Sequence, residues 1–174
     1  MVNRYDEITR AFKWEVPARF NMAQACCARW AAERSRFALY WEDESGARAA
    51  YSFWDIQQQA NRLSNALAAL GVERGDRVAL ILPQRPETAI AYVAIFQMGA
   101  IALPLSHLFG PEALEYRINH AEASVALVEP ATLASLWAVR DRLPTLRHVI
   151  GVGGARESGV LVYEDLLARA SRSS

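Results

Sequence analysis

Lysine is nearly absent from this sequence of 174 residues. Lys13 is the only lysine among 19 basic residues, so any chemistry that needs a lysine has to use Lys13 or do without one. Cysteine is almost as scarce: Cys26 and Cys27 are adjacent, which gives neither a good disulfide nor the spacing of metal ligands. The three histidines are scattered and none is paired with a cysteine, which disfavours a zinc site.

Long apolar runs and an excess of one charge are also missing. The longest apolar runs, such as residues 89–96, are far short of the ~20 residues that cross a bilayer, so we expect no transmembrane segment. Nineteen basic residues balance 19 acidic ones, which leaves no basic field to attract nucleic acid. No signal or transit peptide is visible at the start, and a cytoplasmic location is therefore the default expectation.

What is present is a globular composition, with 52% hydrophobic and 22% charged residues, which suits one domain or subdomain with a real core. From Arg77 onward, short apolar runs alternate with helical patterns. We expect strands at 77–82, 100–103, 124–128 and 147–150, and helices at 87–98, 111–121 and 131–142. This alternation predicts an α/β fold: a partial, doubly wound, mostly parallel sheet with helices on both faces.

The segment before this sheet has a different organisation. Residues 1–20 are expected to form an extended arm that lies on the body. Asn21 is a good N-cap for a helix over Met22–Arg34. Apolar runs at 37–42 and 48–51 flank an Asp-Glu-Ser-Gly turn, which predicts a β-hairpin.

The clearest single element is a helix that begins after Ser52. Asp55 is placed for a capping box with Ser52, and Gly71 ends the helix. Between them one apolar face recurs at spacings of four, three, four and three, formed by Ile56, Ala60, Leu63, Leu67 and Leu70. Toward the C-terminus we expect a loose loop at 151–159 and a terminal helix at 164–170.

Three sequence runs carry a resemblance to a known family. They read RGDRVALILPQRPE at 74–87, GAIALPL at 99–105 and LFGPEAL at 108–114. Their order and spacing resemble the AMP-forming acyl-CoA synthetases of the adenylate-forming (AMP-binding) superfamily, and the LFGPEAL run resembles bacterial medium-chain and related members. The resemblance extends from about Phe20 to Ala170, and it is with the N-terminal portion of such enzymes.

Similar synthetases convert a carboxylic acid, ATP and CoA to acyl-CoA, AMP and pyrophosphate, with Mg²⁺. The resemblance implies a Ser/Thr/Gly-rich phosphate loop ending in Pro-Lys, an aromatic-x-x-Thr-Glu motif and a second lysine on a mobile domain. Neither motif occurs in this sequence, and Lys13 matches neither lysine. We therefore expect residues 1–20 to be an arm and 21–174 to be the N-terminal subdomain of a synthetase-like large domain, truncated before the phosphate loop.

Few residues are candidates for a binding site. Arg85 lies in a loop where a sheet edge could meet an anionic ligand, and it is a candidate on that ground, although a solvated or salt-bridged arginine is the favoured interpretation. The resemblance places Ser106 and His107 where acetyl-CoA synthetases have a loop near CoA, and it places Ala134 and Trp137 where those enzymes carry an arginine pair for CoA. The loss of that pair argues against an acetyl-specific relative. No catalytic residue and no metal ligand is predicted.

Our leading interpretation is a fragment of an acyl-CoA synthetase that is inactive alone and binds none of ATP, Mg²⁺ or CoA by itself. Its partner would be the missing C-terminal part of the synthetase, or a second copy of the chain. The alternative is a non-catalytic binding or interaction module derived from such an enzyme. Exposure of residues 125–167 separates the two, because a cut sheet should expose an apolar face there. An unrelated nucleotide-binding domain is disfavoured, because Arg156 stands where a glycine loop needs its third glycine.

Overall fold

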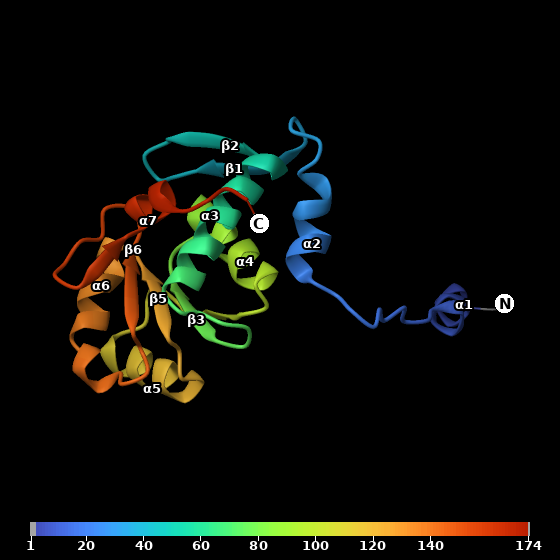
Figure 1. The fold of residues 1–174 in the computed structure, drawn as a ribbon. Helices are drawn as coiled ribbons and strands as arrows, with labels where there is room; N and C mark the ends of the chain where they lie inside the picture. Colours follow the sequence, from blue (N-terminus) through green and yellow to red (C-terminus); the bar gives the residue numbers. More distant parts are fainter. Residues whose placement is uncertain (1–2, 174) are drawn as a thin grey trace.

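The computed structural model describes residues 3–173 and contains one parallel sheet, one hairpin and seven α-helices in that range (Figure 1). The helices are α1 (Arg4–Ala11), α2 (Met22–Cys26), α3 (Phe53–Ala69), α4 (Pro86–Gln97), α5 (Pro111–Ala121), α6 (Pro130–Trp137) and α7 (Tyr163–Arg169). The strands are β1 (Phe37–Glu42), β2 (Arg48–Ser52), β3 (Arg77–Ile81), β4 (Ile101–Pro104), β5 (Val125–Val128), β6 (His148–Gly151) and β7 (Val160–Val162). Two 3-10 turns, Ala28–Trp30 and Arg140–Arg142, follow α2 and α6.

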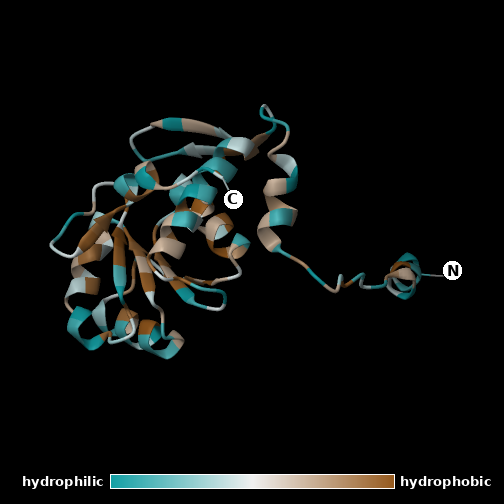
Figure 2. Cartoon of the chain, in the orientation of Figure 1, coloured by the Kyte–Doolittle hydropathy of each residue, from teal (hydrophilic) through white to brown (hydrophobic). Residues whose placement is uncertain are grey.

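The predicted parallel sheet is confirmed. Five strands pair in the order β4-β3-β5-β6-β7, and every pair is parallel. All four residues of β5 are buried, which explains why its sequence is apolar throughout rather than alternating. Figure 2 shows these central strands as the hydrophobic interior of the body.

Helices cover both faces of the sheet, as the sequence predicted. Val78 and Leu80 of β3 point to one face, where they meet a core built mainly from α3 and α4, with α7 joining it. Ala79 and Ile81 point to the other face, where α5 and α6 cover them. Each fully buried leucine or isoleucine in these two clusters contributes roughly 1.5–3 kcal/mol of burial free energy. The sheet is thus a buried scaffold whose two edges and two ends alone can meet other molecules.

The capping box of α3 has formed. The Ser52 hydroxyl accepts a hydrogen bond from the Asp55 amide at 3.2 Å, and the Asp55 carboxylate accepts one from the Ser52 amide at 2.9 Å. Gly71 follows the helix with a φ of +80°, the left-handed conformation that favours glycine. The helix expected between Ser52 and Gly71 is therefore confirmed at both ends.

The N-terminal segment corrects two expectations. The helix expected at Met22–Arg34 is shorter: Asn21 does cap it, but α2 ends at Cys26 and a 3-10 turn follows. Cys27, between them, leaves helical geometry, and its buried thiol donates to the Phe53 carbonyl at 3.6 Å. Residues 1–20 were expected to be extended and to lie on the body. Instead, the described residues 4–11 form α1, whose side chains are all exposed and which stands away from the body (Figure 1).

The C-terminal half holds three further differences. The helix expected at 131–142 is divided into α6 and a 3-10 turn, because Val139 leaves helical geometry. Strand β7 was missed, since three residues give no pattern and the strand forms only by pairing with β6. The apolar face expected on 125–167 is not there: this range, all of it described, contains no exposed large hydrophobic side chain. Among residues 3–173, no helix combines the length and the apolar character needed to cross a bilayer.

Candidate functional site

The candidate site lies at the carboxyl ends of β3, β5 and β6. Strand β4 joins one side of β3 and β5 joins the other, so the strand order reverses at β3. The helices that follow are on opposite faces, with α4 on one and α6 on the other. In open α/β sheets, ligands bind in the crevice outside the carboxyl ends of the strands at such a switch point. Three loops meet there: residues 82–85 after β3, Glu129 after β5, and 152–155 after β6.

Arg85 is held firmly at this edge. It is the N-cap residue of α4, and its guanidinium makes two hydrogen bonds to Glu87, from Nε to Oε2 at 2.7 Å and from Nη2 to Oε1 at 3.0 Å. Only about a fifth of each side chain is exposed, at 21% and 22%. Hydrogen bonding to Glu87 raises the pKa of Arg85, so the guanidinium stays charged. Arg85 is thus engaged in an ion pair, the arrangement that the sequence favoured for it, and its contact with a ligand stays a prediction.

Gly153 lies directly against the guanidinium of Arg85. Gly153 has a φ of +63°, and a Cβ at this position would lie 2.8 Å from Nη2 of Arg85 and 3.0 Å from its Cζ. Contacts below 3.0 Å essentially do not occur for real side chains, so a Cβ at position 153 would force the Arg85 guanidinium to shift, and the positive φ independently favours glycine. The loop after β6 and the loop after β3 therefore meet at this pair.

Tyr163 adds a buried hydroxyl near the same edge. Its side chain is 3% exposed, and within residues 3–173 its Oη has no hydrogen-bond partner. Burial raises the pKa of Tyr163, and the negative charge of Glu87 adds to this effect. Burial likewise raises the pKa of Tyr51, with Glu87 as the second cause. Tyr51 and Tyr163 are thus both under the electrostatic influence of the ion pair of Arg85 and Glu87.

Ser106 and His107 lie in the loop after β4. Because β4 is parallel to β3 and adjacent to it, this loop leaves the same edge of the sheet as Arg85. Both side chains are exposed, and the Ser106 hydroxyl accepts a hydrogen bond from the Leu108 amide at 3.2 Å. No hydrogen bond or ion pair in the described part of the chain joins either residue to Arg85. The structure therefore brings the three predicted residues to one edge but not into contact.

The sequence did not single out Glu87, Gly153 or Tyr163. A signal existed for Glu87, which follows Arg85 by two residues in the P-x-x-P-E run. The glycine loop hinted at Gly153, but β7 rather than a helix follows that loop, which is unlike a dinucleotide-binding turn. Nothing marked Tyr163, which is buried in the core that α3, α4 and α7 form on one face of the sheet. In residues 3–173, no three His, Cys, Asp or Glu side chains gather to hold a metal ion.

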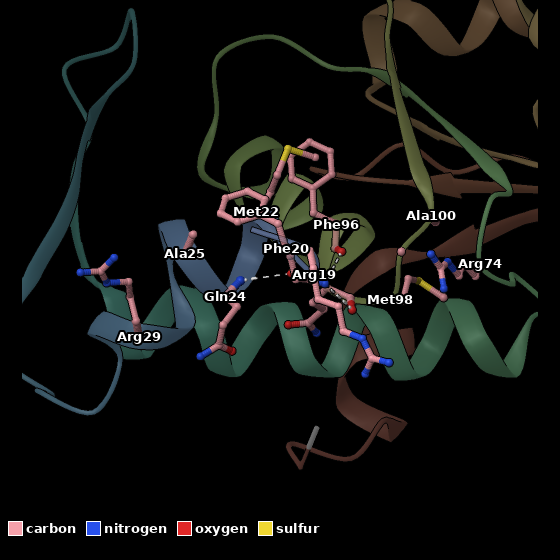
Figure 3. Close-up of a pocket in the computed structure, with 14 residues that line it drawn as sticks. Arg19, Phe20, Met22, Gln24, Ala25, Arg29, Arg74, Phe96, Met98 and Ala100 are labelled. Atoms are coloured by element: carbon pink, nitrogen blue, oxygen red, sulfur yellow. Dashed lines mark hydrogen bonds between the residues drawn. The ribbon is translucent and has the colours of Figure 1, made fainter. Parts of the chain in front are cut away.

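A large groove of about 1400 Å³ lies elsewhere, at the opposite end of the sheet. It runs between residues 18–25 and the end of α4, and it reaches Ala100 just before β4 (Figure 3). The topology of the sheet and the position of this groove thus point to different places. We assign the candidate ligand site to the carboxyl edge, because the switch point is there.

Comparison with known proteins gives a consistent relationship. Residues 27–172 match the family model of the AMP-binding enzyme. The acetyl-coenzyme A synthetase of Bacillus subtilis (strain 168) is 32% identical over 98% of this chain and 32% of its own length. The 3-hydroxypropionyl-coenzyme A synthetase of Sulfurisphaera tokodaii is 34% identical over 68% of this chain and 18% of its own length.

Solved structures give the same picture. The acyl-CoA synthetase of Brucella canis superposes with a TM-score of 0.83 and 26% identity, over 99% of this chain and 33% of that one. An anthranilate CoA ligase in complex with anthranoyl-AMP superposes with a TM-score of 0.84 and 24% identity, over 92% of this chain and 30% of that one. The chain spans about a third or less of the length of the relatives that it matches.

Proposed function

The chain belongs to the AMP-binding enzyme family, and from this membership we propose that it supplies the N-terminal part of an ATP-dependent, AMP-forming acid–CoA ligase. The complete reaction would convert a carboxylic acid, ATP and CoA to acyl-CoA, AMP and pyrophosphate. The observation that carries the proposal is the family match over residues 27–172, which takes in the whole five-stranded sheet. Names of relatives that act as CoA ligases support it.

We propose that this chain is inactive alone. A triphosphate calls for backbone amides and cationic side chains that converge on it. Here Lys13 is exposed on the N-terminal segment, and Arg85 at the sheet edge is paired with Glu87. The residues present therefore do not fit ATP and Mg²⁺, and we derive no chemical step from them. Their part would be to shape one wall of the cleft, with Ser106 and His107 exposed beside it.

The acid and the cellular setting are also matters of proposal. Relatives are named for acetate, 3-hydroxypropionate and long-chain fatty acids, so the relatives favour no single acid, and neither a medium-chain acid nor a role in fatty acid metabolism is preferred. We propose that CoA and ATP bind only when the rest of a synthetase is present, and that the chain works in the cytoplasm.

One observation favours a second candidate function, a non-catalytic binding module. A sheet that has lost its neighbour should expose apolar residues on its later strands, yet residues 125–167 expose no large hydrophobic side chain. Such a module would keep the fold and the edge loops without the chemistry. The two candidates differ in what happens when the remainder of a synthetase is supplied.

The experiment measures pyrophosphate release from the purified chain with ATP, Mg²⁺, CoA and a panel of short, medium and aromatic acids. We expect no release above a blank lacking protein. Acid-dependent release would contradict the proposal, because it would mean that the reaction proceeds without the Pro-Lys phosphate loop and the second lysine, neither of which occurs in this sequence. The same assay with the C-terminal part of a synthetase added separates the candidates: acid-dependent release is expected of an enzyme part, and none is expected of a binding module.

A further inference from the structure

Exposed apolar side chains gather on one part of the chain. Twelve large hydrophobic side chains are exposed in the described residues, and seven of them lie between positions 5 and 22. We call these seven the arm surface: Tyr5, Ile8, Phe12, Trp14, Val16, Phe20 and Met22. Together they expose on the order of several hundred Å² of apolar area along one segment of the chain, which is much for a soluble monomer to leave uncovered. We therefore expect another polypeptide surface to cover the arm surface.

Helix α1 has an apolar face that is fully exposed. Tyr5, Ile8 and Phe12 follow one another at spacings of three and four, which places them on one face of the helix and its C-cap. The helix has proper ends, with Asn3 as N-cap and acidic residues in the first turn, yet it buries no residue. An isolated helix of eight residues is marginal in water, and tertiary packing normally stabilises such helices. The apolar face of α1 thus lacks the surface that would stabilise it.

The groove of Figure 3 continues the arm surface onto the body. Phe20 and Met22 of the arm surface line it together with Phe96 and Met98 at the end of α4. The Asn21 side-chain amide donates to the carbonyl of Phe96 at 3.0 Å and to that of Gln97 at 3.2 Å, which ties the root of the arm to α4. The arm therefore leaves the body from a fixed point.

The charge of this groove restricts what can fill it. Arg19, Arg29 and Arg74 line the groove, spread along its length in Figure 3, and no acidic residue lines it. A partner with acidic side chains opposite these arginines would be electrostatically complementary. A second copy of the chain is a poor match, because its arm over residues 3–20 carries four basic and three acidic residues.

We infer that the arm surface and the groove bind the polypeptide that forms the other two thirds of an AMP-binding enzyme, through an apolar segment with acidic side chains. This inference rests on the proposed function. The superposition on the Brucella canis synthetase covers 99% of this chain, so it includes the arm, but only 33% of that protein. An arm that stands away from its own body is thus aligned with a protein about three times as large, most of which has no counterpart in this chain.

The test uses the full chain, co-expressed with the part of the Bacillus subtilis acetyl-coenzyme A synthetase that lies beyond the region aligned with this chain. We expect a 1:1 complex on size exclusion that weakens as salt concentration rises. The variant Phe12→Asp/Trp14→Asp should weaken it at least tenfold. Tyr116→Asp is the matched control, since Tyr116 is 66% exposed on α5, outside the arm surface. Because all three side chains are exposed, the thermal midpoints of the variants alone should match that of the unmodified chain.

Each other outcome overturns the inference. No complex with the unmodified chain would do so, as would a complex that tolerates the arm substitutions. A homodimer that the arm substitutions dissociate would make a second copy the occupant. Pyrophosphate release from the complex separates this inference from the proposed function. A complex that needs the arm but releases no pyrophosphate would support the binding surface and refute the proposed function. Pyrophosphate release that is unchanged by the arm substitutions would support the proposed function and refute the binding surface.

Discussion

The guanidinium of Arg85 lies where a side chain of residue 153 would begin, so glycine at residue 153 favours the close approach of the loop after β6 to Arg85 in the loop after β3. Glu87 holds the guanidinium in place from the first turn of α4. The pair therefore fixes the spacing of two loops at the carboxyl edge of the sheet, where the candidate site lies.

Substitution of Gly153 tests this contact, and Gly154 supplies the control. Both glycines have positive φ, at +63° and +87°, but a Cβ at Gly154 meets no atom within 4 Å. We expect Gly154→Ala to lower the free energy of unfolding by roughly 1 kcal/mol and Gly153→Ala by roughly 1 kcal/mol more. Urea denaturation measures both. In an Arg85→Ala background, Gly153→Ala and Gly154→Ala should lower the free energy of unfolding by the same amount. A difference that persists there would mean that the extra cost of Gly153→Ala does not come from contact with Arg85.

Removal of the α3 cap should be costly. Ser52→Ala deletes the acceptor of the Asp55 amide and leaves half of a capping box, so we expect a loss of about 1 kcal/mol. Ser158→Ala is the control, because Ser158 is exposed in a loop and should change stability by less than about 0.5 kcal/mol. Equal denaturation midpoints for the two variants would show that the cap contributes nothing measurable.

The hydroxyl of Tyr163 should be dispensable for folding. It is buried without a partner in the described residues, so Tyr163→Phe removes a desolvated polar group and should raise the free energy of unfolding by up to about 1 kcal/mol. The raised pKa of Tyr163 adds a pH test. The unfolded chain releases this proton near pH 10 while the folded chain keeps it, so stability falls above pH 10. Tyr163→Phe should show a shallower fall. A large loss of stability at pH 7 would mean instead that the hydroxyl has an unseen partner.

The two adjacent cysteines should behave differently. Cys26 is exposed, whereas Cys27 is buried and burial, with Cys26 as a lesser cause, raises the pKa of its thiol from 9.0 to about 11. We expect a thiol reagent at pH 8 to modify Cys26 rapidly and Cys27 only on unfolding, and Cys26→Ser to abolish the rapid phase.

The same thiol makes stability depend on pH. Since the folded pKa is the higher one, the contribution of Cys27 is complete below pH 9 and is lost as the pH rises toward 11. Cys27→Ala should lose less stability over that interval than Cys26→Ala, which leaves the buried thiol in place. Parallel curves of stability against pH for the two variants would contradict the assignment.

Sequence reasoning worked where one physical signal acts locally. Three features depend on residues that are close together in the sequence: the capping box at Ser52, the glycine after α3 and the apolar strands of a covered sheet. Each was confirmed. It failed where pairing decides the structure. Strand β7 has three residues and exists because β6 offers it a hydrogen-bonding edge, and α2 ends early, just before Cys27, whose side chain is buried in the core.

The candidate site was less accessible to such reasoning. Arg85 was found because a charged residue stood in a loop after a strand, but its pairing depends on Glu87 and on a glycine 68 positions later. The unpartnered hydroxyl of Tyr163 depends on how α7 lies against α3, which no local pattern encodes. Contacts between distant loops are what the sequence alone leaves open.

The strand order β4-β3-β5-β6-β7 has a consequence for biosynthesis. Once β3 and β4 have paired, β5 joins the free side of β3, and β6 and β7 are then added outward one at a time. No strand has to insert between two that are already joined. A ribosome delivering this chain from its N-terminus therefore presents each strand when its docking edge is open, and the sheet can be assembled at the pace of translation, without rearrangement of what is already built.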